Sequence, residues 1–180
     1  MMPVIAHRTV HTALLEAAEL DRIRDMVDRA FAGQFDGTDW DHALGGLHIL
    51  VTDDDRVMAH AAVVQRRLVH DDKPIRAGYV EAVAVDRALR GRGYAAAVMD
   101  EAERIIRAAY DLGALSAADG VERFYLSRGW QAWQGPTGVL TPTGLTLTPD
   151  DDDSTYVLPV SAPAKVTGVL ACDWRDGDVW

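Results

Sequence analysis

Cysteine is nearly absent from this chain of 180 residues, which contains a single one, Cys172. One cysteine excludes an intramolecular disulfide and is typical of proteins in a reducing compartment. The sequence also has no apolar run long enough to cross a membrane, and its first residues lack the apolar core of a signal peptide. We therefore expect a cytoplasmic protein without a membrane partner.

Basic residues are scarce as well: 18 lysines and arginines are outnumbered by 28 aspartates and glutamates, for a formal net charge of −10. Proteins that bind nucleic acid need a basic face for the phosphates, so we expect no nucleic-acid partner. An acidic protein suits a cationic ligand, although acidity can also serve solubility alone. The length and the ordinary hydrophobic content of 48% predict one globular domain over residues 1–180.

Hydrophobic periodicity and turn residues predict a mixture of helices and strands. Apolar residues at helical spacing predict helices over 17–32, 94–109 and 120–127, with a short one inside 34–46. We expect Gly33 to end the first of these helices. Short β-branched runs predict strands at 8–13, 47–52, 56–68, 75–85, 114–116, 130–133 and 155–160. The three strands between 47 and 85 should form an antiparallel meander. We expect an acidic loop at 150–153 and a polar tail at 171–180.

The most informative stretch joins a predicted strand to a predicted helix through a loop that contains glycines. An apolar run over 79–85 is followed by Arg90-Gly91-Arg92-Gly93-Tyr94-Ala95 and then by an apolar helical stripe. Glycines let a backbone approach a ligand closely, and a helix start directs N–H groups and partial positive charge at an anion. The pattern predicts that a pyrophosphate binds the backbone amides of Arg92, Gly93, Tyr94 and Ala95. Two glycines without this context would indicate only a turn.

The order of the elements and two short motifs resemble the GNAT superfamily of N-acetyltransferases. The loop 90–95 matches the acetyl-CoA signature Arg/Gln-x-x-Gly-x-Gly/Ala, and 124–130 resembles the second motif, a helical tyrosine followed by Gly-aromatic. Segments along nearly the whole chain resemble the mycobacterial aminoglycoside 2′-N-acetyltransferases, namely 30–33, 38–40, 65–68, 78–81, 112–116, 172–175 and 177–180. The resemblance implies an α+β GNAT fold, with a mixed, mostly antiparallel central sheet flanked by helices.

The same resemblance implies a function and its partners. The acetyl group of acetyl-CoA would pass by direct attack to the 2′-amino group of a cationic aminoglycoside, which would confer resistance. Acetyl-CoA is then a co-substrate, no metal takes part, and a homodimer stays open. Two alternatives remain: an acetyltransferase for an endogenous amine such as a cell-wall amino sugar, and a CoA-binding module without turnover.

Acetyl transfer needs a polarised thioester, a group that handles the amine proton and an acid for the leaving thiolate. The backbone of Val83, Ala84 and Val85 could pair with the pantetheine amides as an added strand, which makes the Val83 N–H the donor to the thioester oxygen. Glu81, expected on the same strand face as Val83 and Val85, could bind the amine or accept its proton through water. In this superfamily the helical tyrosine, here Tyr125, can reach the leaving thiolate and donate a proton to it. Taken alone, a strand glutamate is more often solvated and a helical tyrosine more often packs in a core.

The resemblance also implies an acceptor site rich in carboxylates, because each buried ammonium needs a charged partner. Its residues here are Gln34, Asp39, Glu81, Ala82, Ser116, Asp150, Asp151, Asp178 and Trp180. Gln34 stands where the family can carry an aspartate and Ala82 where it can carry a glycine, which leaves room for a different substrate preference. A plain solvated loop is the alternative for 150–153.

The six histidines show no metal-ligand spacing with a cysteine or an acid, so we expect no metal site and interpret them as surface or core residues. Cys172 has no nearby histidine pattern and is expected to be an inert, packed thiol.

Overall fold

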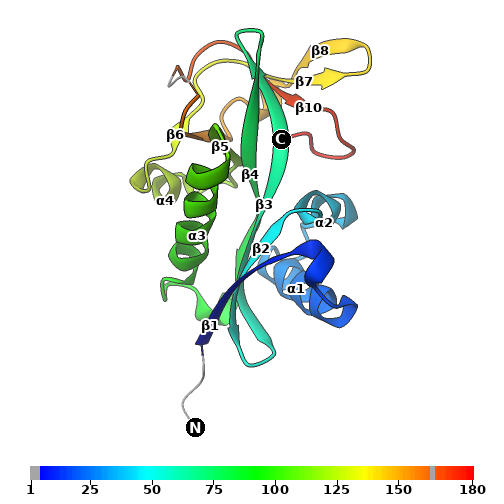
Figure 1. Cartoon of the computed structure of the whole chain (residues 1–180), viewed down its shortest axis with the longest axis vertical. Coiled ribbons are helices and arrows are strands. Elements are labelled where there is room, and N and C mark those ends of the chain that lie inside the picture. Colours follow the sequence, from blue (N-terminus) through cyan, green and yellow to red (C-terminus); the bar gives the residue numbers. More distant parts are fainter. Residues whose placement is uncertain (1–4, 163–164) are drawn as a thin grey trace. The chain divides into compact units, whose positions relative to one another are not determined.

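The computed structural model describes residues 5–162 and 165–180, which fall into two compact units (Figure 1). Unit 1 comprises residues 1–64 and 80–105, and unit 2 comprises residues 65–79 and 106–180. Three elements contribute residues to both units: β3 (Arg56–His70), β4 (Lys73–Val85) and α3 (Tyr94–Ala109). Within the described residues, none of the helices is both long and apolar enough to span a membrane.

Unit 1 is built on an antiparallel sheet. β1 (Ile5–His11) pairs with β2 (Leu47–Asp53), and β2 pairs with the first half of β3. Helices α1 (Ala17–Ala30) and α2 (Gly37–Ala43) lie on one side of this sheet and the first turns of α3 on the other (Figure 1). The core beneath α1 and α2 includes Ile23, Met26, Val27, Trp40, Leu50, Ala82 and Ala84. The end of β4 is therefore packed against the helical layer.

The local chemistry of the chain explains where α1 ends and α2 begins. Ala32 and Gly33 adopt positive φ angles of 61° and 76°, and the Gly33 N–H donates to the Asp28 carbonyl at 3.1 Å, which ends α1 as expected. Asp36 caps α2, and Asp39 completes a capping box by accepting from the Asp36 N–H at 2.9 Å. The short helix expected inside 34–46 is confirmed.

Unit 2 contains a sheet with the strand order β6-β9-β5-β4-β3-β10-β7-β8. Its remaining elements are β5 (Leu112–Ser116), α4 (Glu122–Ser127), β6 (Gln131–Ala132), β7 (Thr137–Thr141), β8 (Gly144–Leu147), β9 (Thr155–Pro159) and β10 (Leu170–Asp173). The pairs β4–β5 and β7–β10 are parallel, whereas β3–β10, β5–β9, β6–β9 and β7–β8 are antiparallel. The expected mixed, mostly antiparallel sheet flanked by helices is confirmed.

Three expectations for the elements need correction. The polar tail predicted at 171–180 is wrong at its start, because β10 lies between β3 and β7 with Leu170, Ala171 and Cys172 buried. The hairpin β7–β8 was not predicted, since its threonines and glycines carry little apolar signal. The first strand covers 5–11 rather than 8–13, because residues 12–14 form a 3₁₀ turn in which the His11 side chain accepts from the Ala13 N–H.

Candidate active site

The glycine loop enters α3 in unit 1 with its backbone set for an anion. The Ala97 N–H donates to the Gly93 carbonyl at 3.0 Å, so Gly93 precedes the helix and the first-turn N–H groups have no intrahelical acceptor. Gly91 and Gly93 have φ angles of 76° and 86°, and a Cβ at either would meet nothing within 4 Å. Glycine is therefore needed here for backbone conformation, and the space in front of the helix start is open.

The residues before this loop are fixed by side-chain contacts. Arg90 donates through Nη2 to the carbonyl of Ala30, the last residue of α1, at 2.8 Å, where a cation complements the helix dipole. Asp86 accepts from the Ala88 N–H at 3.0 Å and pairs with Arg56 at 2.8 Å, and this hydrogen bond to Arg56 lowers the pKa of the Asp86 carboxyl. The Arg90 side chain thus ties the loop to α1, while Gly91, Arg92 and Gly93 are exposed.

The end of β4 carries Glu81, Ala82 and Val83 on an irregular backbone. Ala82 has a φ angle of 50°, and among the described residues it is the only non-glycine with a positive φ inside a strand. This conformation favours glycine, which explains why the resembling family can carry glycine at this position. Burial still alternates along 81–85, with Ala82 and Ala84 buried and the side chains of Glu81 and Val83 on the less buried side, as expected for one strand face. Both side chains are half-buried.

Two buried histidines lie behind this irregular backbone, and neither was singled out from the sequence. His60 Nδ1 lies 2.8 Å from the Ala82 carbonyl oxygen, and His60 Nε2 lies 2.9 Å from His48 Nδ1. Burial lowers the pKa of His48 to about 4 and that of His60 to about 3, so both rings are neutral at physiological pH. A histidine inside an apolar strand was the available signal, because a buried imidazole needs hydrogen-bond partners.

Tyr125 lies on α4 in unit 2 and is buried among aromatic rings. Its ring centroid is 6.2 Å from that of Trp130, in an edge-on arrangement, and 6.2 Å from that of Tyr156, in a tilted one. Burial raises the pKa of the Tyr125 phenol to about 12. The phenol therefore stays protonated across the physiological range and can act as a donor.

The residues expected at the acceptor site divide between the two units. In unit 1, Gln34 is exposed, and one carboxylate oxygen of Asp39 serves the capping box of α2. In unit 2, the Ser116 hydroxyl donates to that of Ser154 at 3.1 Å. Trp180 is buried, and its Nε1 has no hydrogen-bond partner among the residues that the structure describes.

The acidic run and the C-terminal segment meet within unit 2. Burial raises the pKa of Asp151, and the charges of Asp178, Asp150 and Asp152 raise it further, against a hydrogen bond from Thr148. Asp152 Oδ1 accepts from the Thr137 N–H and hydroxyl at 2.7 and 2.8 Å. Asp150 and Asp153 are exposed, whereas Asp151 and Asp152 are half-buried, and an ammonium group would relieve the repulsion between these charges.

A buried guanidinium holds the C-terminal segment. Arg66 donates to the Asp173 carboxylate at 2.7 Å, to the Asp173 carbonyl at 2.9 Å and to the Val179 carbonyl at 2.7 Å. Its guanidinium carbon lies 4.8 Å from the centre of the Tyr79 ring. The Cys172 thiol donates to the Val179 carbonyl at 3.2 Å, and burial raises its pKa to about 11, so the thiol is packed and stays protonated at physiological pH.

No group of three histidine, cysteine or acidic side chains over 5–162 and 165–180 is arranged to hold a metal ion.

Comparison with known proteins identifies the family. A family model described as an acetyltransferase (GNAT) domain matches residues 11–133. This chain therefore belongs to the GNAT acetyltransferase family. Within that family it is similar to the aminoglycoside 2′-N-acetyltransferase of Mycolicibacterium fortuitum, with 54% identity over 177 residues that cover 96% of this chain and 91% of the relative.

Solved structures share the fold at low sequence identity. The GNAT family N-acetyltransferase YhbS from Escherichia coli, in complex with CoA, has a TM-score of 0.67 and 16% identity, covering 95% of this chain and 91% of its own. A GNAT family acetyltransferase from Brucella melitensis, in complex with acetyl-CoA, has a TM-score of 0.62 and 15% identity, and the match covers 95% of this chain and 97% of that protein's chain. These likenesses confirm the α+β GNAT fold.

Replacing Gly93 by alanine tests the glycine loop. The φ of 86° would strain the new residue by about 1–2 kcal/mol. The methyl group would also occupy the open space in front of α3, where a phosphate would lie, so we expect the Kd for CoA to rise about tenfold or more. Gly120→Ala is a matched control, with a φ of 85° and equally open space. Calorimetric titration should find CoA affinity unchanged in the control; wild-type affinity in folded Gly93→Ala would exclude this loop.

Protonation of the buried histidines should destabilise the protein as the pH falls. Their pKa values of about 4 and about 3 lie below the 6.5 of an ordinary histidine, so the unfolded state binds more protons below pH 6.5. Stability present above pH 6.5 is therefore lost progressively toward pH 4. We expect urea midpoints to fall less steeply over this range in His60→Asn, which keeps a donor but cannot titrate. Parallel curves for both proteins would contradict this assignment.

Proposed function

We propose that this protein transfers the acetyl group of acetyl-CoA to the 2′-amino group of aminoglycosides and so confers resistance to them. The observation that carries the proposal is 54% identity, over nearly the full length of both chains, to a protein named for that reaction. A cytoplasmic location fits the single reduced cysteine. In this proposal residues 1–180 act as one catalytic domain, because β3, β4 and α3 contribute residues to both units.

Acetyl-CoA is the proposed acetyl donor. The open space before the start of α3 and the left-handed glycines support a pyrophosphate held by the amides of Arg92, Gly93, Tyr94 and Ala95. The pantetheine arm would then pair with the backbone of 83–85 as an added strand. The E. coli and B. melitensis proteins of this fold were crystallised with CoA and acetyl-CoA, which is consistent with such a ligand.

The reaction we propose is a direct attack of the amine on the thioester. The amine nitrogen forms a bond to the acetyl carbon, negative charge develops on the carbonyl oxygen, and the Val83 N–H stabilises it. The carbon–sulfur bond then breaks. The amine gives its proton to Glu81 through water, and the departing thiolate takes the proton of Tyr125. The high pKa of the Tyr125 phenol keeps that proton available.

Carboxylates are the proposed partners of the ammonium groups of the acceptor. The carboxylates proposed for this role are those of Asp39, Glu81, Asp150, Asp151 and Asp178. The raised pKa of Asp151 supports this role, because a cation relieves the repulsion of clustered carboxylates. Gln34 and Ser116 would contribute hydrogen bonds. Trp180 would contact the acceptor from the segment that Arg66 holds through the Val179 carbonyl.

The first experiment measures thiol release from acetyl-CoA with a panel of aminoglycosides. We expect release with acceptors that carry a 2′-amine and none with matched acceptors that carry a 2′-hydroxyl, because a neutral amine is a far stronger nucleophile toward a thioester than a hydroxyl group. An acetyltransferase for an endogenous amine would leave the panel unreacted and still turn over with small cell-wall amino sugars. Binding of CoA without any turnover would indicate a non-catalytic module.

Tyr125→Phe tests the proposed acid. Loss of a general acid typically costs about 10²–10⁴ in rate, so we expect kcat to fall by about that factor while CoA affinity is retained. Tyr156→Phe is the matched control, because Tyr156 packs against the same ring and has no proposed role. Rapid-quench measurement of a single turnover reports the chemical step directly. Wild-type single-turnover rates in Tyr125→Phe would assign the proton to another group or to water.

A further inference from the structure

A continuous chain of hydrogen bonds crosses the sheet of unit 1 and ends at the irregular residue of β4. The Thr12 hydroxyl lies 2.8 Å from His48 Nε2, His48 Nδ1 lies 2.9 Å from His60 Nε2, and His60 Nδ1 lies 2.8 Å from the Ala82 carbonyl oxygen. Both imidazoles are completely buried. In the register of β2 and β3, His48 pairs with Ala62 and His60 with Leu50, so the rings are diagonal neighbours on one face.

The carbonyl at the end of this hydrogen-bond chain determines which nitrogen of each imidazole carries the proton. The Ala82 carbonyl can only accept, so His60 must carry its proton on Nδ1 and accept at Nε2. His48 must then donate from Nδ1 and accept at Nε2 from the Thr12 hydroxyl. The Thr12 oxygen in turn accepts from the Gly45 N–H at 2.9 Å. Thr12, His48 and His60 each both donate and accept, which strengthens the neighbouring bonds.

The Ala82 carbonyl belongs to the same peptide unit as the Val83 N–H. A trans peptide is planar, and its C=O and N–H point in opposite directions. The bond from His60 therefore sets the direction of the Val83 N–H on the other side of the strand. It also draws electron density toward the carbonyl oxygen, which makes the N–H a stronger donor.

We propose that His60, held by His48, is a positioning residue that aims the Val83 N–H at the thioester oxygen of acetyl-CoA. This inference rests on the proposed acetyl transfer. It gives the pair of neutral, buried histidines a task in the reaction, although neither ring touches the substrate. It also explains how a left-handed alanine keeps its conformation inside a strand, where that backbone is strained.

Packing around the rings supports a fixed geometry rather than a mobile one. The Trp40 ring centre lies 6.2 Å from that of His48 and 6.5 Å from that of His60, and the two imidazole centres are 5.2 Å apart. Trp40 is itself buried and comes from α2, whose start is fixed by the Asp36–Asp39 capping box. The ring of Trp40 from α2 therefore packs against both imidazoles in the interior of unit 1.

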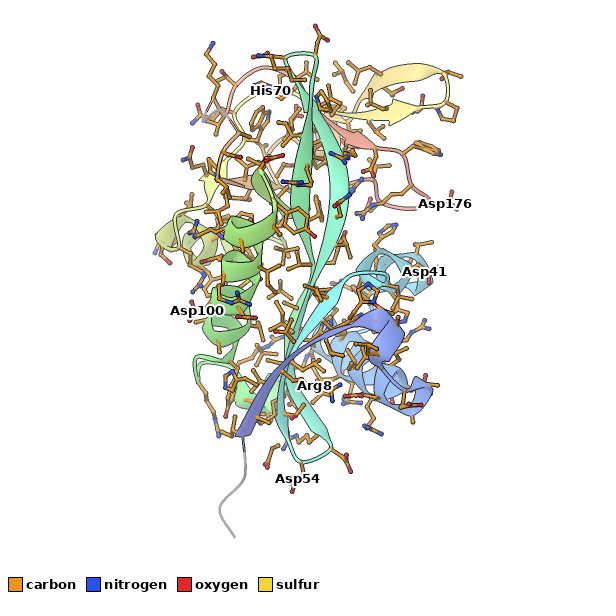
Figure 2. All side chains as sticks on the ribbon, in the orientation of Figure 1. Arg8, Asp41, Asp54, His70, Asp100 and Asp176 are labelled. Carbon is orange, nitrogen blue, oxygen red and sulfur yellow. The ribbon has the colours of Figure 1, made fainter. Side chains whose placement is uncertain are left out.

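Two substitutions of His60 separate hydrogen bonding from packing. His60→Asn keeps an N–H near the place of Nδ1, whereas His60→Phe keeps a ring and has no donor. His70→Phe is the control, because His70 is buried on the same strand and bonds a backbone carbonyl, that of Val169, at 3.1 Å, at the far end of β3 (Figure 2). Kinetics with acetyl-CoA and a 2′-amino aminoglycoside should show kcat reduced about 10- to 100-fold in His60→Phe, part of the cost of a lost oxyanion donor.

The expected pattern has three further parts. His60→Asn should recover most of kcat, and His70→Phe should keep it within about twofold, because neither disturbs the donor peptide. The Kd for CoA should stay constant in all variants, since CoA lacks the thioester oxygen that Val83 would contact. Equal kcat losses in His60→Phe and His60→Asn, or wild-type kcat in folded His60→Phe, would overturn the proposal.

A spectroscopic experiment on the wild-type protein tests the same proposal. It requires no enzyme turnover and no folded His60→Phe variant. Long-range ¹H–¹⁵N spectra of the wild-type protein should show both His48 and His60 protonated on Nδ1. A His60 ring protonated on Nε2 would remove the bond to Ala82 and with it the proposal. The Val83 amide signal should also move more with acetyl-CoA than with CoA. If aminoglycosides are not acetylated, the proposed function fails alone, and these spectra still decide the role of His60.

Discussion

The conformation of Ala82 is the constraint on which the proposed chemistry depends. A left-handed residue between Glu81 and Val83 turns the backbone inside β4 and sets the directions of the groups on either side. An alanine in this region is strained, so neighbouring contacts must hold it. Ala82 and Ala84 lie in the core beneath α1 and α2, and the Ala82 carbonyl is bound by the buried His60 ring. The hydrophobic packing of unit 1 and its one buried imidazole pair therefore act on the same peptide.

The cofactor loop is tied to the same helical layer by a different contact. Arg90 binds the last carbonyl of α1, and α1 packs in the core that contains Ala82. A change in the position of α1 would therefore disturb both the proposed pyrophosphate site and the proposed oxyanion donor. In unit 2, Arg66 has a comparable role, since it joins β3, β10 and the C-terminal segment through three hydrogen bonds.

Strong periodicity and local chemistry made much of the fold predictable. The apolar stripe of α3 and the glycine that ends α1 marked these elements closely, and short turns marked the strands between 47 and 85. β10 was missed because four residues beside a polar segment carry no periodic signal, although three of them are buried and the strand lies between two others. A strand so short is specified by its neighbours in the sheet, which a local pattern does not contain.

The motifs of the candidate site could be predicted from the sequence, but the contacts that hold its backbone in place could not. The loop at 90–95 and the helical tyrosine have recognisable spacing, so their residues could be named from the sequence. The left-handed angle of Ala82 leaves no trace in an alanine. His48 and His60 are 12 positions apart, and only the register of β2 and β3 makes them neighbours. The Asp39 capping box also had a local signal, an aspartate three residues after Asp36.

Infrared difference spectroscopy of bound acetyl-CoA, labelled with ¹³C at the thioester carbonyl, tests the central claim most directly. A hydrogen bond from a fixed, polarised N–H weakens the carbonyl bond and lowers its stretching frequency. The account predicts a lower frequency in the wild-type complex than in the His60→Phe complex, with His60→Asn close to wild type. The same thioester band in all three complexes would contradict it, because the histidine pair would then have no influence on the group that polarises the substrate.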